Sequence, residues 1–538
     1  EQQISETLFD SNLLKRIPNN AVGFMIYNTE LPSYVRFKQS SWSQMWSQDD
    51  VDSWTSQIYD GELKQTVDKL HKALTTAGVV TDSAQQKESI SEGLGFWGVD
   101  QESKKIVAGM FFSAASNTSL KEKPRALSSL LKSEGLQVSE EKFDGAEGFS
   151  VAFNDTKMQS LGNKIFVAGN DNHLGFSNTK STLQNLFISN SSGQTAKILG
   201  TATFVDAKKR LLDQDGRFLF AYADLAEASE LIPSLLEQEE SKNFVEQIKN
   251  FPIKAIALSK GMKDAPSFSA VVTTSAKTDD QKRWLTSFTE ARGSHSFELA
   301  PSDATFLLSI DGNTVRKLKD AALNELAADQ KARVEEQLAL VNSLQSFGVG
   351  VLESAPSSPL PGVVLIFDSK EPSLLAESLK RRIEDLANGS GLPVGAWQKK
   401  EINGINVNFV QSPFMGVGLF VAESGSHVFV TSSLEASQAV IQTVKGQDKN
   451  LLNSISTSGQ KILTTGAPLL TAHTNFMRLA DTMESLQGSL AAFSGGAQTG
   501  EQERIDMMKK LGSLSISLAY EDGAFKLGSL FEAAPKEG

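Results

Sequence analysis

The side chains that could carry acid–base, nucleophilic or metal chemistry are few and widely spaced. The chain has five histidines and no cysteine. No two histidines lie within one helical turn of each other, so the ligand spacing of a metal-binding helix is missing. Without cysteine there is no disulfide, iron–sulfur cluster or thiol nucleophile. We therefore predict no metal site, no cofactor and no catalytic residue.

Short motifs of hydrolases and nucleotide-binding proteins occur in the wrong context. S-x-x-K stands at 129–132 and 458–461, but the partner motifs S-x-N and K-T-G are not found in fitting places. The glycines of 93–98 lead into a predicted strand, whereas a phosphate-binding loop must open a helix. We predict that the protein is not an enzyme, and an enzyme of unrecognised type is kept as the third alternative.

One candidate binding segment is rich in aromatic residues. Trp42, Trp46 and Trp54 fall within 13 residues, with Met45 and Tyr59 close by. Trp42 and Trp46 are four residues apart, so they share one face of a helix. Tryptophan and tyrosine are enriched at interface hot spots, which favours a binding surface. In the alternative interpretation, these residues form the small core of an inserted helical segment.

A second candidate segment is apolar. Residues 408–422 are nearly free of charge, whereas the corresponding residues 153–168 are polar. The fold therefore does not demand apolar residues here, and we predict that Phe409, Phe414 and Met415 bind a partner or a lipid. The alternative is a buried contact between two halves of the chain.

The elements that position these residues recur along the chain. Five segments have a partner of similar pattern in the same order: 18–28 with 301–311, 93–100 with 347–354, 142–153 with 400–409, 166–177 with 420–431, and 218–228 with 469–479. The dipeptides Asp144-Gly145 and Asn403-Gly404 predict tight hairpin turns at matching places. The shared order indicates an internal repeat.

From this order we predict a tandem duplication of one α+β domain. The first copy spans 17–298, with a tryptophan-rich helical insertion at about 36–62, and follows an N-terminal extension of residues 1–16. The second copy spans 299–538. The expected fold has antiparallel or mixed sheets covered by helices, and each copy has room for two βαββα-like units.

The strand patterns also support a resemblance. The opening P-x-x-A, the later F-V-A…H and the segment 204–225 resemble an uncharacterised bacterial envelope protein family, which is described only as a domain of unknown function. The best matches are Phe204, Leu211, Leu212, Ala221, Tyr222 and Asp224. In the second copy His473 stands where Tyr222 does. The resemblance implies a duplicated α+β protein that is exported or held by one N-terminal membrane helix, and it supplies no active site.

Composition narrows the location and the partners. The 538 residues carry a net charge of −12, which disfavours nucleic acid as a partner. No stretch reaches the length of about 18 apolar residues that a transmembrane helix needs. The lack of cysteine suits an oxidising compartment, so we predict a periplasmic or exported protein of the bacterial cell envelope. The given chain begins at Glu1. Whether an N-terminal anchor was removed before this residue is left open.

These observations favour binding over catalysis. We predict a scaffold or adaptor that contacts another envelope protein or associates with itself. The alternative function is a carrier or chaperone of a hydrophobic ligand such as a lipid. The two functions differ in what should co-purify with the protein, namely a protein partner or a lipid.

Overall fold

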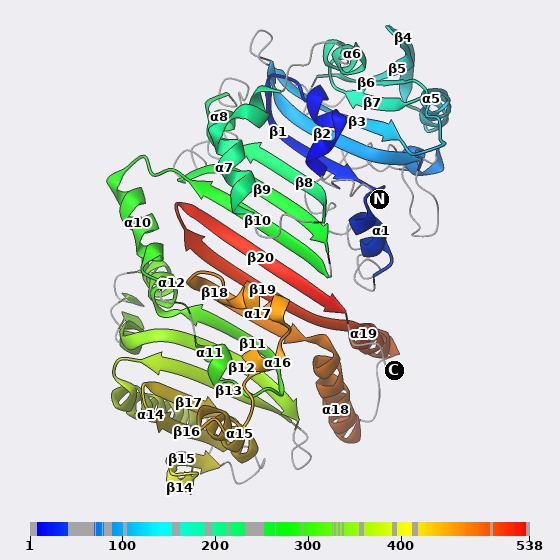
Figure 1. Cartoon of the computed structure of the whole chain (residues 1–538). Coiled ribbons are helices and arrows are strands. Elements are labelled where there is room, and N and C mark those ends of the chain that lie inside the picture. The colour runs from blue at the N-terminus through cyan, green and yellow to red at the C-terminus, as the bar shows by residue number, and fades with distance from the viewer. Residues whose placement is uncertain are drawn as a thin grey trace, which may run out of the picture. The chain divides into compact units, whose positions relative to one another are not determined.

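Figure 1 shows a computed structural model of the chain, in which helices pack on the strands of open antiparallel sheets. The structure describes residues 8–40, 69, 72–77, 79, 89–100, 105–152, 162–188, 196–211, 216–231, 252–263, 265–291, 293, 295–324, 326–327, 330–331, 334–335, 338–354, 360–389, 395–411, 418–494 and 499–533. Contacts divide the chain into two compact units, Glu1–Gln281 and Lys282–Gly538. Each unit is described by itself below.

The N-terminal unit is built on ten described strands. They are β1 (Ala21–Asn28), β2 (Ile90–Asp100), β3 (Lys105–Ala114), β4 (Gln137–Phe143), β5 (Ala146–Ala152), β6 (Lys164–Gly169), β7 (His173–Ser177), β8 (Arg217–Asp224), β9 (Ile253–Met262) and β10 (Pro266–Thr274). Their hydrogen-bonded order is β10-β9-β8-β1-β2-β3-β7-β6-β5-β4. The order brings β8 beside β1, although most of the unit lies between them in sequence.

Helices and short turns of this unit pack on both faces of its strands. They are η1 (Leu8–Asp10), η2 (Asn12–Arg16), α1 (Pro32–Lys38), α5 (Lys123–Ser133), α6 (Lys180–Ile188), η4 (Lys197–Gly200), α7 (Ala202–Arg210) and α8 (Leu225–Leu231). Helix α7 contacts β8, β9 and β10, while α5 contacts β4, β5 and β6.

An aromatic core fixes α7 against the central strands. The Phe204 ring of α7 lies 5.8 Å from Phe24, 6.0 Å from Phe220 and 5.3 Å from Tyr222, measured between ring centroids. All four side chains are at most 5% exposed. Because side chains alternate along a strand, the neighbours Met25 and Ala221 point to the opposite face.

The C-terminal unit also has ten described strands. They are β11 (Ala304–Asp311), β12 (Leu344–Ser354), β13 (Pro361–Ser369), β14 (Gln398–Ile402), β15 (Ile405–Gln411), β16 (Gly418–Ser424), β17 (His427–Thr431), β18 (Pro468–Asn475), β19 (Leu511–Glu521) and β20 (Ala524–Ala533). Their order is β20-β19-β18-β11-β12-β13-β17-β16-β15-β14.

The helical elements of the C-terminal unit follow the same general plan. They are α10 (Asp279–Thr289), which begins at the end of the first unit, α11 (Ser296–Leu299), α12 (Gly312–Asn324), η6 (Ala339–Ser343), α14 (Pro372–Gly389), α15 (Leu434–Val444), α16 (Leu451–Ser454), α17 (Thr457–Thr464), α18 (Phe476–Ser494) and α19 (Thr499–Lys510). The buried side chains of Phe297, Leu307 and Leu463 belong to one core between α11, α15 to α17 and the strands.

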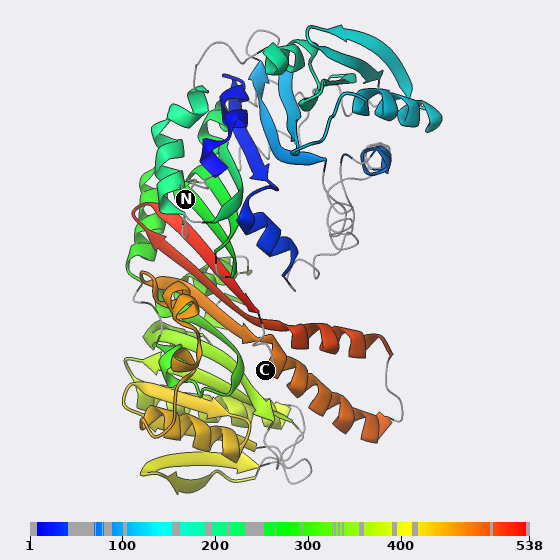
Figure 2. The ribbon, with the colours of Figure 1, turned by 45° about the vertical axis from the view of Figure 1, so that its right-hand side comes forward.

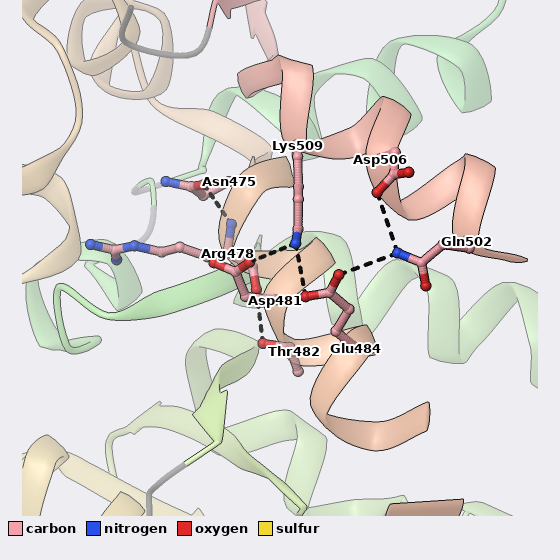
Figure 3. Close-up of polar contacts among 8 residues, drawn as sticks. All are labelled: Asn475, Arg478, Asp481, Thr482, Glu484, Gln502, Asp506 and Lys509. Carbon is pink, nitrogen blue, oxygen red and sulfur yellow. Dashed lines mark hydrogen bonds and ion pairs between the residues drawn. The ribbon is translucent and has the colours of Figure 1, made fainter. Parts of the chain in front are cut away.

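Helices α18 and α19 form a helical hairpin between β18 and β19, and they run side by side in Figure 2. Figure 3 shows the ion pairs that join them, in which Lys509 Nζ lies 2.8 Å from Glu484 Oε2 and 3.7 Å from Asp481 Oδ1. The side chain of Asn475 caps the start of α18, because its Oδ1 accepts a hydrogen bond of 3.1 Å from the Arg478 backbone N–H.

The two tight turns predicted from sequence are confirmed. Asp144 and Gly145 connect β4 to β5, and Gly145 has a φ of 75°. Asn403 and Gly404 connect β14 to β15 with φ angles of 50° and 78°. A two-residue hairpin turn needs positive φ, which glycine adopts freely and asparagine tolerates.

The predicted fold class is wrong. We expected a tandem duplication of one domain with antiparallel or mixed sheets covered by helices, and with room for two βαββα-like units in each copy. Instead the ten described strands of each unit pair in one continuous antiparallel order, so each unit is built on a single large open sheet. The edge strands of a smaller sheet would have unpaired backbone groups, and pairing with a further hairpin gives those groups hydrogen-bond partners. Both units share the same order of ten strands, but this likeness of topology does not show that they are copies.

Candidate functional site

A cavity of about 940 Å³ lies against the strands of the N-terminal unit. This volume falls near the top of the range of about 300–1,000 Å³ that is usual for small-molecule sites. The lining includes the side chains of Met25, Trp97, Met110 and Leu258. Met25 is 40% exposed and Met110 is 47% exposed, so the cavity opens to solvent.

Strand register explains which side chains meet in the cavity. Met25 of β1 pairs with Gly95 of β2 on one side and with Ala221 of β8 on the other. Gly95 in turn pairs with Met110 of β3, and Ala221 pairs with Leu258 of β9. Paired residues of antiparallel strands lie on the same face. These five residues therefore form a row across five strands, in which the smallest positions lie between the largest.

Gly95 gives the cavity part of its depth. A Cβ atom added at this position would have only Met25 Cε within 4 Å, at 3.9 Å. In the C-terminal unit the corresponding register position holds Val349, which pairs with Leu308 and Leu365. A valine side chain thus occupies the space that the glycine leaves open in the N-terminal unit.

Two aromatic rings of the cavity lie directly on glycines of the neighbouring strand. A Cβ atom on Gly23 would come within 2.1 Å of Trp97 Nε1, and one on Gly93 would come within 2.3 Å of Tyr27 Cε1. Each ring therefore needs a glycine beneath it, as happens where a side chain packs across a strand. Trp97 and Tyr27 both line the cavity.

Most polar side chains of the lining are already hydrogen-bonded within the protein. Asn178 accepts a bond of 2.9 Å from the Ala108 N–H and donates one of 2.6 Å to the Ile106 carbonyl. Ser177 donates to the Ala108 carbonyl at 3.1 Å. The Tyr222 hydroxyl donates a hydrogen bond of 3.4 Å to Asp224 Oδ2. The cavity wall thus presents mainly carbon to a ligand.

Lys164 is the charged member of the described lining. It begins β6, where it pairs with Ala152 of β5, and its side chain is exposed. Met110 pairs with Phe176 and Phe176 with Val167, so Lys164, an odd number of positions away on β6, projects from the opposite face. The ion pair with Lys180, at 2.7 Å, holds the pKa of the Glu141 carboxyl below its usual range, and the charge of Lys164 adds to this effect. The described lining contains no carboxylate.

Two histidines outside the cavity lining, the buried His473 and the half-buried His173, have lowered pKa values. His473 is 4% exposed, its Nδ1 lies 3.0 Å from the Ser515 hydroxyl, and burial together with the nearby Arg478 lowers its pKa to about 4. His173 stacks on Phe111 with 5.1 Å between ring centroids, and burial lowers its pKa to about 4 as well. Both imidazoles are therefore neutral at pH 7 and act as packed polar groups.

The structure gives two further negative observations. Within the described ranges, no three or more histidine, aspartate or glutamate side chains gather in an arrangement that could hold a metal ion. Among the described helices, none combines the length and the apolar character that are needed to span a bilayer.

Of the binding residues expected from sequence, Phe409 is the one that the structure describes, and it is not among the described lining residues of this cavity. Trp42, Met45, Trp46, Trp54 and Tyr59 lie outside the described residues, as do Phe414 and Met415. Phe409 is described in β15, where its ring stacks on Phe420 at a centroid distance of 5.5 Å. It packs at the edge of a core with Ile402 and Val407. Its role in binding a partner stays a prediction.

The cavity residues carried only a weak signal in the sequence. In 93–98, glycines alternate with Leu94 and Phe96, and this strand is confirmed as β2. A glycine at every second position predicts a sheet face without side chains, which is a place where another group can approach closely. Met25 and Met110 gave no such signal, because single apolar residues in strands are ordinary.

Comparisons with known proteins identify no family. No family model matches the chain, and no curated protein matches it. One similar solved structure is described as "Structure of crystal form IV of TP0453", with 12% identity, coverage of 43% of this chain and 78% of that chain, and a TM-score of 0.24. Another, "Structure of crystal form III of TP0453", has 11% identity, coverage of 45% and 81%, and a TM-score of 0.25. Likeness at these TM-scores carries no conclusion about function.

Proposed function

We propose that the N-terminal unit binds a hydrophobic ligand, such as a lipid, in its cavity. The observation that carries the proposal is the combination of a volume of about 940 Å³ with a wall of methionine, aromatic and aliphatic side chains. Methionine adapts its shape to different apolar surfaces, which suits a site for flexible chains. Of the functions considered from the sequence, this is the carrier of a hydrophobic ligand.

The energetics of the cavity support a reversible binder. A ligand that buries about 300 Å² of apolar surface gains roughly 7 kcal/mol from the hydrophobic effect. Association and the ordering of a flexible chain consume part of this gain. Because the polar wall groups of Ser177 and Asn178 are already bonded to the protein, a hydrocarbon chain leaves neither of them without a partner.

The proposal is tested by ligand extraction and by a fluorescent probe. The gently purified protein is extracted with organic solvent for lipid mass spectrometry, and the stripped protein is titrated with the neutral probe N-phenyl-1-naphthylamine. We expect Met110→Glu to weaken probe binding at least tenfold, because it places a carboxylate in the apolar wall.

Met507→Glu is the matched control, since Met507 is 46% exposed on α19 and Met110 is 47% exposed. It should bind the probe as the unchanged protein does. Equal binding by all three proteins, or a clean extract together with no probe binding, would contradict the proposal.

The scaffold or adaptor function has less support. Its principal residues, at 42–59, lie outside the described residues. A location in the cell envelope is likewise a proposal, supported by the lack of cysteine. Fractionation of cells with an antibody against the chain tests it, and recovery in the cytoplasmic fraction would contradict it.

A further inference from the structure

Trp97 brings to the cavity wall a polar group that the protein itself does not use. It is half-buried in β2, lines the cavity, and pairs with Gly23 of β1 and Ala108 of β3. Its indole ring lies over Gly23, because a Cβ atom built there would come within 2.1 Å of Nε1. Within the part of the chain that the structure describes, no hydrogen bond of the Trp97 N–H is found. The indole nitrogen can only donate, so it lacks an acceptor.

The residues beside Trp97 in the strand register do not offer it an acceptor side chain. Gly23 pairs onward with Ala223 of β8, and neither has a side-chain oxygen. On the other side, Ala108 adjoins Asn178, whose Oδ1 already accepts a bond of 2.9 Å from the Ala108 N–H. The backbone carbonyls of these strands lie in the plane of the sheet and pair across it, whereas the indole lies above that plane. An acceptor for this N–H therefore comes from water or from a ligand.

The open space of the cavity adjoins the indole. Gly95 lies two residues before Trp97 on β2, so both are on the same face and about 7 Å apart along the strand. A Cβ atom on Gly95 would have only Met25 Cε within 4 Å. An apolar chain that fills this space displaces water from around the indole. A pure hydrocarbon then leaves the N–H without a partner, whereas an acceptor oxygen on the ligand replaces the lost water.

The wall on this face does not suit a charged acceptor. Lys164 projects from the opposite face, and the described lining contains no carboxylate. A carboxylate or phosphate placed in the apolar wall would lose its hydration without gaining an ion of opposite charge. An uncharged carbonyl oxygen loses far less on dehydration and accepts one hydrogen bond. It therefore fits both the open N–H and the uncharged wall.

Resting on the proposed hydrophobic ligand, we infer that this ligand is an uncharged acyl compound, and that Trp97 Nε1 donates a hydrogen bond to its carbonyl oxygen. An acyl ester has this chemistry, because its alkyl chain suits the apolar wall and its carbonyl oxygen accepts without donating. Trp97 thus selects the ligand in addition to forming part of the wall.

The inference is tested with ligands that differ in the acceptor. Methyl decanoate, 1-chlorodecane and decanoate compete with N-phenyl-1-naphthylamine at neutral pH, below the concentration at which each aggregates. Trp97→Phe keeps an aromatic ring in the wall but removes the N–H. We expect it to weaken the binding of methyl decanoate about three- to tenfold, as for the loss of one hydrogen bond. The affinity for 1-chlorodecane should change by less than about twofold, since this ligand has no oxygen to accept the bond.

A second measurement uses the unchanged protein. The indole N–H resonance of Trp97 is assigned by its absence from the NMR spectrum of Trp97→Phe. It should move downfield when methyl decanoate binds and move less when 1-chlorodecane binds. The same movement with both ligands would overturn the inference.

Trp284→Phe is the matched control, since Trp284 is 39% exposed on α10 and lies outside the described lining. It should bind all three ligands as the unchanged protein does. If Trp97→Phe loses affinity equally for methyl decanoate and 1-chlorodecane, or for neither, the inference is overturned but the hydrophobic site stands. Tighter binding of decanoate than of its methyl ester overturns the assignment of an uncharged ligand. Failure of the probe and of every ligand to bind the unchanged protein contradicts the proposed function itself.

Discussion

At the scale of single residues, glycines shape the cavity as much as the large side chains do. Gly95 leaves an opening between Met25 and Met110, and Gly23 and Gly93 let two aromatic rings lie on the sheet. These glycines have different tolerances. Gly95 has open space above it, whereas a Cβ on Gly109 would come within 2.5 Å of the Phe176 carbonyl oxygen.

This difference predicts opposite results for two matched substitutions. Gly95→Val should fill the cavity and weaken binding of the apolar probe about tenfold. The free energy of unfolding should stay the same or rise by about 0.5–1 kcal/mol, because glycine is unfavourable inside a strand.

Gly109→Val should destabilise the fold, because the carbonyl of a paired strand cannot move away easily. Probe titration and urea unfolding check both variants. A Gly95→Val protein that unfolds more easily and binds the probe normally would show that the probe does not bind in the space above Gly95.

At the scale of elements, the hairpin of α18 and α19 combines ion pairs with apolar packing. Lys509 bonds to Glu484, and this hydrogen bond holds the pKa of the Glu484 carboxyl below its usual range. The pair is partly exposed, so water and salt screen it. Ile505 of α19 and Ala480 of α18 are instead fully buried. Burial of Ile505 should therefore dominate the stability of the hairpin.

We predict that Ile505→Ala lowers the free energy of unfolding by about 2–5 kcal/mol, as expected for a large-to-small change in a core. Lys509→Gln should have a much smaller effect, and it should vanish at 1 M salt. Urea unfolding at low and high salt measures both. A larger loss from Lys509→Gln than from Ile505→Ala would reverse this ranking.

Hairpins and amphipathic helices could be predicted at this scale because their causes are local. Asn403 and Gly404 specify a turn by their own backbone preferences. The pairing of β1 with β8 could not be predicted in this way, since Met25 and Ala221 belong to distant segments. Partner strands are selected by packing on both faces, and a short sequence pattern contains no information on the partner.

At the scale of the whole molecule, each unit holds one described histidine with a lowered pKa. His173 belongs to the N-terminal unit and His473 to the C-terminal unit, and burial lowers both pKa values to about 4. An unfolded histidine titrates near 6.5, so between about pH 6.5 and 4 the unfolded chain binds protons that the folded chain does not. Stability conferred by the neutral imidazoles is complete above pH 6.5 and decreases as the pH falls.

We predict that the unchanged protein loses stability between pH 7 and pH 5, and that His473→Gln reduces this loss. For His473 the difference at pH 5 is on the order of 1–2 kcal/mol. The variant keeps a group that can bond to the Ser515 hydroxyl, but it does not titrate. Urea unfolding at the two pH values measures the effect. An unchanged pH dependence in His473→Gln would show that this histidine does not couple folding to protons.

Sequence alone determined the local hairpins, the strand 93–98 and the absence of cysteine chemistry. Local backbone preference and composition suffice for these features. The tertiary structure decided the sheet order and the cavity. Met25, Gly95, Met110, Ala221 and Leu258 come from five strands, and only antiparallel register aligns them in one row. Such a site depends on which strands pair, and that choice is made by the packing of the whole unit.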